Sequence, residues 1–241
     1  VKADLANISM NGVLNGRSSA DIQCDDAPLP SYCSAGKDFN TSGIGTGSMG
    51  HNTLNISGDA YSIASGMTYA GLRSVSADAT ARQAVDVTAD HISMDMSVYC
   101  QSGYSSIARY HAYAAAQSSY SLVFDFTTTS VINLTGSRFY SPLGGEGVHD
   151  SFQLIYPNRQ SFDVNGQFTF PSVFRLESVL DPGTYSILYS ANLDAYSDFS
   201  QPQGASASLR FNLNANFTPV PESSWVSAGP AVLVLAAGRA L

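Results

Sequence analysis

The chain of 241 residues carries a net charge of −8 at neutral pH. Only 12% of its residues are charged, about half the usual fraction of a globular protein. This acidic balance excludes a nucleic-acid-binding protein that relies on a basic surface patch. Ser, Thr, Asn, Gly and Tyr fill the polar positions, which favours a weakly charged extracellular β protein over a cytosolic enzyme with Lys/Glu-rich helices.

The three cysteines divide into a close pair and a distant third residue. Cys24 and Cys33 flank a short proline-bearing loop whose ends can meet, so we expect a disulfide between them, formed in an oxidising compartment. Two reduced thiols are the alternative, because spacing alone does not set the geometry of a disulfide. We expect no metal or other cofactor. Carboxylates and loop carbonyls leave weak Ca²⁺ binding chemically open, but no Asp-x-Asp-x-Asp loop supports it.

Residues 1–57 are rich in Gly, Ser and Asn, and we expect them to form strands and loops of the same sandwich as the rest of the chain. Short strands are predicted at residues 4–10 and 53–57. The glycine-rich run 41–48 is typical of a flexible loop. It lacks the Gly-Lys-Ser/Thr ending of a phosphate loop, so nucleotide binding has no support.

Residues 58–217 show the period-2 alternation of half-buried strands. In residues 91–100, the side chains of one face are all apolar, and Cys100 belongs to that face as a small core residue. Residues 106–117 are rich in alanine, but aromatic residues at two-residue spacing favour a strand there. The longest alternation, residues 205–217, predicts an antiparallel strand with one wet face.

Turn signals separate these strands. Asn165-Gly166 lies between two short aromatic runs and predicts a two-residue hairpin. Pro182-Gly183 suits the middle of a type II turn, where glycine takes a positive φ. Many short strands with frequent Gly and Pro turns predict an all-β fold, an antiparallel β-sandwich or jelly roll.

The composition of the chain changes after residue 217. Residues 218–225 form a proline-containing spacer that cannot serve as a central strand. Residues 226–241 are almost wholly apolar and predict a short C-terminal hydrophobic helix that acts as a sorting or anchor segment, with Trp225 at the position of an interfacial aromatic. An apolar strand or helix docked on the sandwich is the alternative.

Residues 219–241 resemble the C-terminal signal of the PEP-CTERM family of exported bacterial proteins. Val220, Pro221 and Glu222 stand for the Val-Pro-Glu-Pro-like motif, and Ser223 replaces its second proline. The membrane segment and its basic end are represented by Trp225, Val232, Leu233, Val234, Leu235 and Arg239. The resemblance implies processing by an exosortase-type enzyme, transient anchoring in the inner membrane, and delivery to the cell surface or exopolysaccharide matrix of a Gram-negative bacterium.

No catalytic residue is predicted. His149, Asp150 and Ser151 have the residue types of a hydrolase triad, but neighbours on a strand point to opposite faces. We therefore expect a non-enzymatic exported surface or extracellular-matrix protein. The alternatives are a carbohydrate-binding β-sandwich module and a secreted hydrolase with an unrecognised site. A sugar-contacting face would draw on tyrosines, of which the candidates are Tyr99, Tyr110, Tyr113, Tyr189 and Tyr196.

Overall fold

In the described residues of the computed structural model, twelve β-strands form two antiparallel six-stranded sheets. The structure describes residues 5–24, 31–47, 52–68, 71–103, 110–143, 148–166, 172–198 and 204–220. Sheet A contains, in spatial order, β2 (Ser31–Gly47), β1 (Leu5–Cys24), β6 (Tyr110–Phe126), β11 (Gly183–Asp198), β8 (Val148–Ile155) and β9 (Ser161–Gly166). Sheet B contains β10 (Ser172–Leu180), β7 (Ser130–Leu143), β12 (Ala205–Pro219), β5 (His91–Ser102), β4 (Gly71–Val87) and β3 (Asn52–Thr68).

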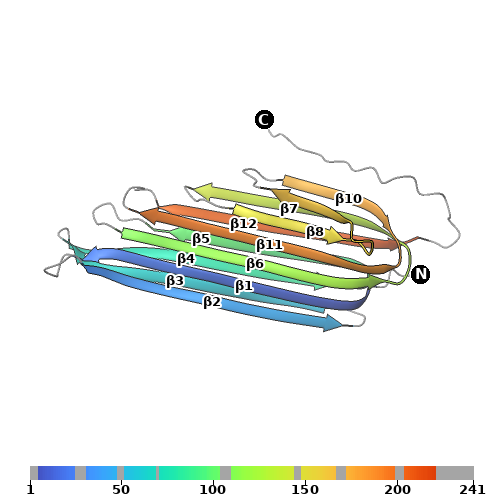
Figure 1. Cartoon of the computed structure of the whole chain (residues 1–241), viewed down its shortest axis with the longest axis horizontal. Coiled ribbons are helices and arrows are strands. Elements are labelled where there is room, and N and C mark those ends of the chain that lie inside the picture. The colour runs from blue at the N-terminus through green and yellow to red at the C-terminus, as the bar shows by residue number, and fades with distance from the viewer. Residues whose placement is uncertain are drawn as a thin grey trace, which may run out of the picture.

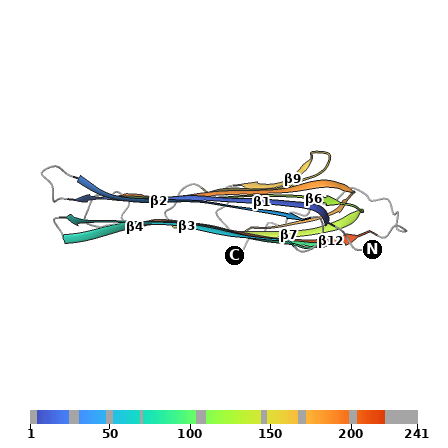
Figure 2. The ribbon, with the colours of Figure 1, turned by 90° about the horizontal axis from the view of Figure 1, so that it is seen from below.

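The two sheets stack as flat layers, which are seen face-on in Figure 1 and edge-on in Figure 2. The prediction of an all-β antiparallel sandwich is therefore confirmed. The predicted C-terminal helix, residues 226–241, lies outside the described residues. The described ranges contain no helix that is long and apolar enough to cross a membrane.

Alternation of side chains decides which face of each strand enters the core. In β5 the buried face runs from Ile92 to Cys100, and in β12 it runs from Ala205 to Phe217, as the sequence predicts. β6 is a strand rather than a helix, and Ala112, Ala114 and Ala116 point inward. Because strand side chains alternate, the opposite faces of these strands carry the polar residues.

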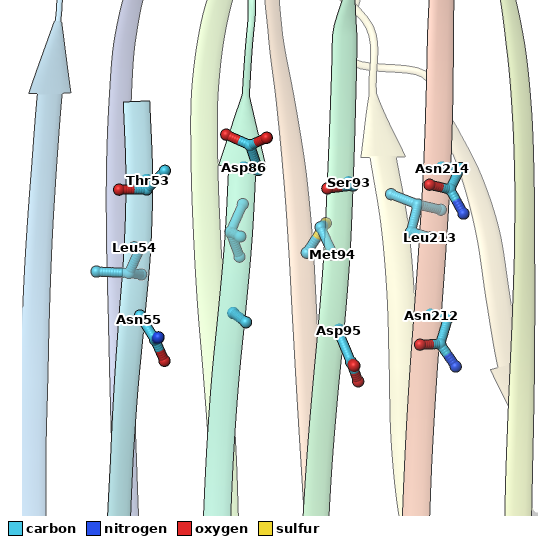
Figure 3. A pocket seen from close by; sticks show the side chains of 12 residues that line it. Thr53, Leu54, Asn55, Asp86, Ser93, Met94, Asp95, Asn212, Leu213 and Asn214 are labelled. Atoms are coloured by element: carbon cyan, nitrogen blue, oxygen red, sulfur yellow. The ribbon is translucent and has the colours of Figure 1, made fainter. Parts of the chain in front are cut away.

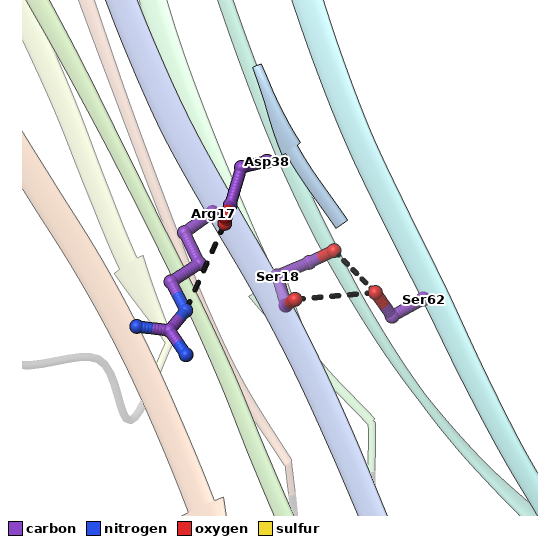
Figure 4. A network of polar contacts seen from close by, with 4 residues as sticks. All are labelled: Arg17, Ser18, Asp38 and Ser62. Carbon is purple, nitrogen blue, oxygen red and sulfur yellow. Dashed lines mark hydrogen bonds and ion pairs between the residues drawn. The ribbon is translucent and has the colours of Figure 1, made fainter. Parts of the chain in front are cut away.

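Small side chains bring the two sheets close together at the side of the sandwich formed by β1, β3 and β4. The hydroxyl of Ser18 on β1 lies 2.6 Å from that of Ser62 on β3, so the two sheets touch there through a buried hydrogen bond (Figure 4). Gln83 on β4 donates from Nε2 to the Ser118 hydroxyl and the Ser119 carbonyl, both at 2.8 Å. The Ser18 and Ser62 hydroxyls and the amide nitrogen of Gln83 thus have partners in the opposite layer, which offsets the cost of burying them. Oε1 of Gln83 is buried without a hydrogen-bond partner.

Aromatic rings fill the opposite side of the core. Phe211 on β12 lies at the centre of this cluster, with its ring centroid 4.4 Å from that of Tyr189, 5.6 Å from Phe152 and 6.1 Å from Phe174. Tyr189 and Phe152 belong to sheet A, whereas Phe174 and Phe211 belong to sheet B. The cluster therefore joins the two layers through stacked rings.

The glycine-rich run of residues 41–48 is not a loop as far as it is described. Residues 41–47 belong to β2, which pairs with β1 along its whole length. A Cβ at Gly43 would lie 2.6 Å from a methyl carbon of Leu54 and 2.8 Å from one of Ile56 on β3. Glycine is present because those two side chains occupy its space. The prediction of a flexible loop was therefore wrong.

One predicted turn differs in the structure, and another connects the two sheets. Asn165 and Gly166 are not the loop of a hairpin, because both pair with β8 as the last residues of β9; the expected partner, residues 167–170, lies outside the described residues. Pro182 follows β10 of sheet B and Gly183 begins β11 of sheet A, so the chain crosses from one layer to the other there. Gly183 has a φ of 154°, and a Cβ on it would lie 2.7 Å from Cγ of Pro157.

The last strand also extends further than residue 217. Pro219 still pairs with Ser130 on β7 as the final residue of β12. Since proline tolerates a strand end better than a strand interior, it marks the end of β12 without interrupting it.

Tyr185 fixes the crossing between the layers. Its hydroxyl donates a 2.8 Å hydrogen bond to the carbonyl oxygen of Asp181, four residues earlier. Replacing Tyr185 with phenylalanine is expected to lower the free energy of unfolding by about 0.5–1.5 kcal/mol, the net value of one hydrogen bond, as measured by urea denaturation. Tyr99→Phe removes an exposed hydroxyl bonded to Gln101 and serves as the control, with a change below about 0.5 kcal/mol.

Cys100 is a free, fully buried thiol, as the sequence predicts. Its Sγ donates to the carbonyl of Leu193 at 3.3 Å. Burial, together with the negative charge of Asp194, raises the pKa of this thiol from 9.0 to about 12. The native chain therefore holds the proton in a pH range where the unfolded chain releases it.

This difference predicts a loss of stability in alkali. The contribution of Cys100 is complete below pH 9 and is lost as the pH rises through about 12, with a slope of up to about 1.4 kcal/mol per pH unit. Urea denaturation at pH 8 to 11 is expected to show a steeper fall in unfolding free energy for the native sequence than for Cys100→Ala. Equal slopes for the two proteins would contradict this assignment.

Candidate functional site

The predicted sorting residues lie at the limit of the described chain. Val220 donates its backbone N–H to the carbonyl of Thr129 at 3.0 Å, which holds the exit of β12 against sheet B. Pro221 and Glu222 fall outside the described residues, as does the predicted membrane segment (Trp225, Val232, Leu233, Val234, Leu235 and Arg239). The sorting signal stays a prediction from sequence.

The cysteine pair is described in part. Cys33 is disulfide-bonded, and it pairs with Ile22 in the β1–β2 ladder. Cys24 is the last residue of β1, and its side chain lies outside the described part of the structure. Cys24 as the partner of Cys33 therefore remains a prediction.

The adjacent residues His149, Asp150 and Ser151 do not converge. His149 is exposed on the outer face of β8, whereas Asp150 points into the core and pairs with Arg138. Ser151 lies on the outer face again and shares a hydrogen bond of 2.8 Å with Ser190. The alternation of the strand separates these groups, so they form no triad.

The Arg138–Asp150 pair is a buried ion pair that sequence reasoning missed. Nε of Arg138 on β7 lies 3.0 Å from Oδ2 of Asp150 on β8, and the two side chains are 1% and 2% exposed. Arg138 also donates to the carbonyl of Val164 and lies over the ring of Phe174. Burial raises the pKa of Asp150, and the charge of Arg138 opposes that shift. The pair joins sheet A to sheet B and is closed to solvent.

The five candidate tyrosines separate into two groups. Tyr110 and Tyr189 are buried in the core. Tyr113 and Tyr196 lie directly opposite each other on the outer face of β6 and β11. Tyr99 lies on the outer face of sheet B, where its hydroxyl bonds to Gln101. The outward group is the one available to a ligand.

Tyr113 and Tyr196 form an aromatic patch together with His111. The rings of His111 and Tyr196 are stacked at 6.4 Å with an interplanar angle of 26°, and Nδ1 of His111 lies 3.0 Å from the Tyr196 hydroxyl. That hydroxyl donates to Asp198 at 3.3 Å. Burial and the charge of Asp198 raise the pKa of Tyr196 above its ordinary value.

A row of amides crosses the same face of sheet A. We call it the amide row. Its four amides, Asn40, Asn15, Gln117 and Asn192, face one another across β2, β1, β6 and β11, and the imidazole of His149 on β8 ends the row. Each side-chain amide offers both donors and an acceptor. The next row along the strands carries the hydroxyls of Ser119, Ser190 and Ser151. A hollow of about 300 Å³ lies between the two rows.

The aromatic patch and the amide row form one continuous surface. Tyr113 and Gln117 are on the same face of β6, four residues apart, which corresponds to about 14 Å along a strand. Between them lies the row of Arg17, Ala115 and Asp194, where Arg17 is in an ion pair with Asp38 at 3.7 Å (Figure 4). We call the aromatic patch, the amide row and the hydroxyl row together the sheet A face.

Sheet B carries a second hollow, of about 370 Å³, on its outer face. The polar residues that line it are labelled in Figure 3: Thr53, Asn55, Asp86, Ser93, Asp95, Asn212 and Asn214. Asp95 is held by Arg210 through two contacts of 2.8 and 3.3 Å. None of the described residues that line this hollow is aromatic. Its chemistry is more ionic than that of the sheet A face.

Fold and surface together define a two-layer antiparallel β-sandwich with a flat, weakly charged face of amides and hydroxyls beside exposed aromatic rings. No protein-family model matches the chain, and a search of curated proteins finds no relative. The described ranges contain no group of three or more His, Cys, Asp or Glu side chains placed to hold a metal ion.

Proposed function

We propose that this chain is a non-enzymatic exported surface or extracellular-matrix protein that binds a neutral polysaccharide through the sheet A face. The observation that carries the proposal is the combination, on one surface, of Tyr113 and Tyr196, which face each other in the β6–β11 ladder, with the amide row. Sugar hydroxyls both donate and accept hydrogen bonds, as amides do, and aromatic rings pack against the apolar faces of sugars.

Charge supports a neutral rather than an acidic glycan. The chain carries a net charge of −8, and a charge of that sign repels a polyanion over the whole surface. Near the aromatic patch, Asp194 and Asp198 lie on β11 opposite Ala115 and His111, while the one arginine of the adjoining row is paired with Asp38.

Two further features support export. The disulfide bond of Cys33 is typical of oxidising compartments. The Val220-Pro221-Glu222 motif and the apolar residues after it resemble an exosortase-type signal, so we propose that the tail is processed at the membrane. Mass spectrometry of the mature C-terminus is expected to show cleavage near Pro221-Glu222; an intact chain that stays in the cytosol would contradict this part of the proposal.

Glycan binding is tested by affinity pull-down on insoluble neutral and acidic polysaccharides, with and without Ca²⁺. Binding to a neutral polysaccharide is expected, and Tyr113→Ala together with Tyr196→Ala is expected to weaken it about tenfold or more, as for aromatic anchors elsewhere. Tyr99→Ala removes an outward tyrosine from sheet B and is the matched control. Retention of full binding by the double variant, or an equal loss in the control, would refute the proposal.

A further inference from the structure

The two sides of the sandwich end in strands of different length. On one side the edge strands are β9 and β10, with six and nine residues. On the other they are β2 and β3, with seventeen residues each, and they lie along the same side of the molecule (Figures 1 and 2). In the described residues no strand pairs with the outer side of β2 or β3. A long edge strand offers unpaired N–H and C=O groups to another strand.

Lys37 covers part of this edge. It pairs in register with the buried Ser18, so it occupies an inward position of β2. Its ammonium lies 3.4 Å from the carboxylate of Asp59, an exposed residue on the outer face of β3. A side chain that connects the inner side of one sheet with the outer side of the other passes around the edge of β3. A charge placed in this way discourages strand pairing near residue 59.

The C-terminal part of β3 differs in composition from the stretch around Asp59. Residues 60–68, which we call the edge segment, contain no charged residue and no proline. Tyr61, Ile63 and Met67 are 52%, 49% and 47% exposed, and Leu72, the ladder partner of Met67 on β4, is 67% exposed. Uncharged segments of alternating apolar residues without proline are those that pair with their own kind. Contiguous exposed apolar side chains mark interaction surfaces.

We propose that the edge segment is a self-association site, at which a second copy of this chain adds its own edge segment as an antiparallel strand. The two-fold axis lies at Ala64, so that Tyr61 faces Met67 of the second copy and Ile63 faces Ser65. This register keeps buried residues on the inner side and exposed ones on the outer side of both copies. Backbone hydrogen bonds provide the attraction, as in other cases of strand addition.

The symmetry closes the assembly at two copies. A two-fold contact uses the same surface on both partners, and the short strands β9 and β10 on the opposite side offer little edge for continued growth. Sheet B then runs without a break from one copy into the other. This assembly stands independently of glycan binding, because it involves sheet B and none of the residues of the sheet A face.

Sedimentation velocity of the full chain over a range of concentrations tests the proposal. A species of twice 25.4 kDa is expected to appear as the concentration rises. Ile63→Lys is expected to raise the dissociation constant about tenfold or more, since charged side chains on an edge block pairing. Val173→Lys places the same charge at a 67% exposed valine on the other edge strand, β10, and is expected to leave the dimer unchanged.

A charge swap tests the register. Tyr61→Lys and Met67→Glu are each expected to weaken the dimer, and the double variant to restore it, because each lysine then faces a glutamate of the other copy. Asp78 lies directly opposite Tyr61 on β4 and gives the new ammonium a partner within the chain, so the fold is preserved. A monomer at every concentration, or a dimer that tolerates Ile63→Lys, would overturn the proposal; a double variant that stays monomeric would overturn the register.

Discussion

Replacing Asp150 with alanine is expected to lower the free energy of unfolding by about 3–5 kcal/mol, because it leaves the guanidinium of Arg138 charged inside the core. Nε of Arg138 lies 3.0 Å from the Asp150 carboxylate, with both side chains almost fully buried. Burial also lowers the pKa of Arg138, which reflects the cost of keeping that charge away from water. Urea denaturation measures the change.

The matched control removes both charges at once. Arg138→Met combined with Asp150→Leu replaces the ion pair with apolar side chains of similar size, and such replacements are commonly neutral or stabilising by about 1–4 kcal/mol. We therefore expect the double variant to be much more stable than Asp150→Ala alone. A double variant as unstable as the single one would show that the ion pair itself, rather than the orphaned charge, determines stability.

Phe211→Ala is expected to cost about 3–5 kcal/mol of unfolding free energy, the usual range for deleting a buried phenyl ring. Phe211 is 0% exposed and stacks on rings of both layers, Tyr189 and Phe152 from sheet A and Phe174 from sheet B. Its loss leaves a cavity where the layers are held apart by aromatic rings. Thermal or urea denaturation is the measurement.

Phe139→Ala is the control for Phe211→Ala. Phe139 is 52% exposed on the outer face of β7, so its truncation removes the same atoms without opening the core. We expect a change of about 0.5 kcal/mol or less. Comparable losses for the two variants would contradict the position of Phe211 between the layers.

Sequence reasoning located the strands whose inward residues are large and apolar. Residues 91–100 and 205–217 were predicted with the correct buried faces because their hydropathy alternates strictly. This alternation of hydropathy is lost in the N-terminal third of the chain, where inward positions hold Ser18, Ala60 and Ser62. Such small side chains pack between close sheets, yet around Ser62 the outward neighbours Tyr61 and Ile63 are the more apolar residues. Hydropathy therefore does not mark the inward face there. The long strands β1, β2 and β3 were therefore predicted only as short strands and loops.

The pairing of strands that are far apart in the chain could not be predicted from the sequence either. Tyr113 points outward because it lies three residues from the inward-pointing Tyr110 on the same strand. Its position opposite Tyr196, however, depends on the register of β6 and β11. The turn at Pro182-Gly183 was recognised, whereas its role as a crossing between layers depends on which strands become neighbours.

The buried ion pair could have been predicted from the positions of its two residues in the alternating pattern of their strands. Arg138 lies on the same face of its strand as Ile132 and Leu134, and Asp150 lies on the same face as Phe152. A charged residue on each of two apolar faces indicates a partner across the core, because an unpaired buried charge is too costly.

The sheet A face is the central claim, and a titration of the isotope-labelled chain with a soluble neutral oligosaccharide, followed by NMR, tests it most directly. Chemical-shift changes are expected to cluster along β6 and β11, at Tyr113, Gln117, Asn192 and Tyr196, and to leave Asn55 and Asn212 on sheet B unaffected. Shift changes confined to the sheet B hollow, or none with any neutral glycan that the protein retains in pull-down, would contradict the assignment of that face.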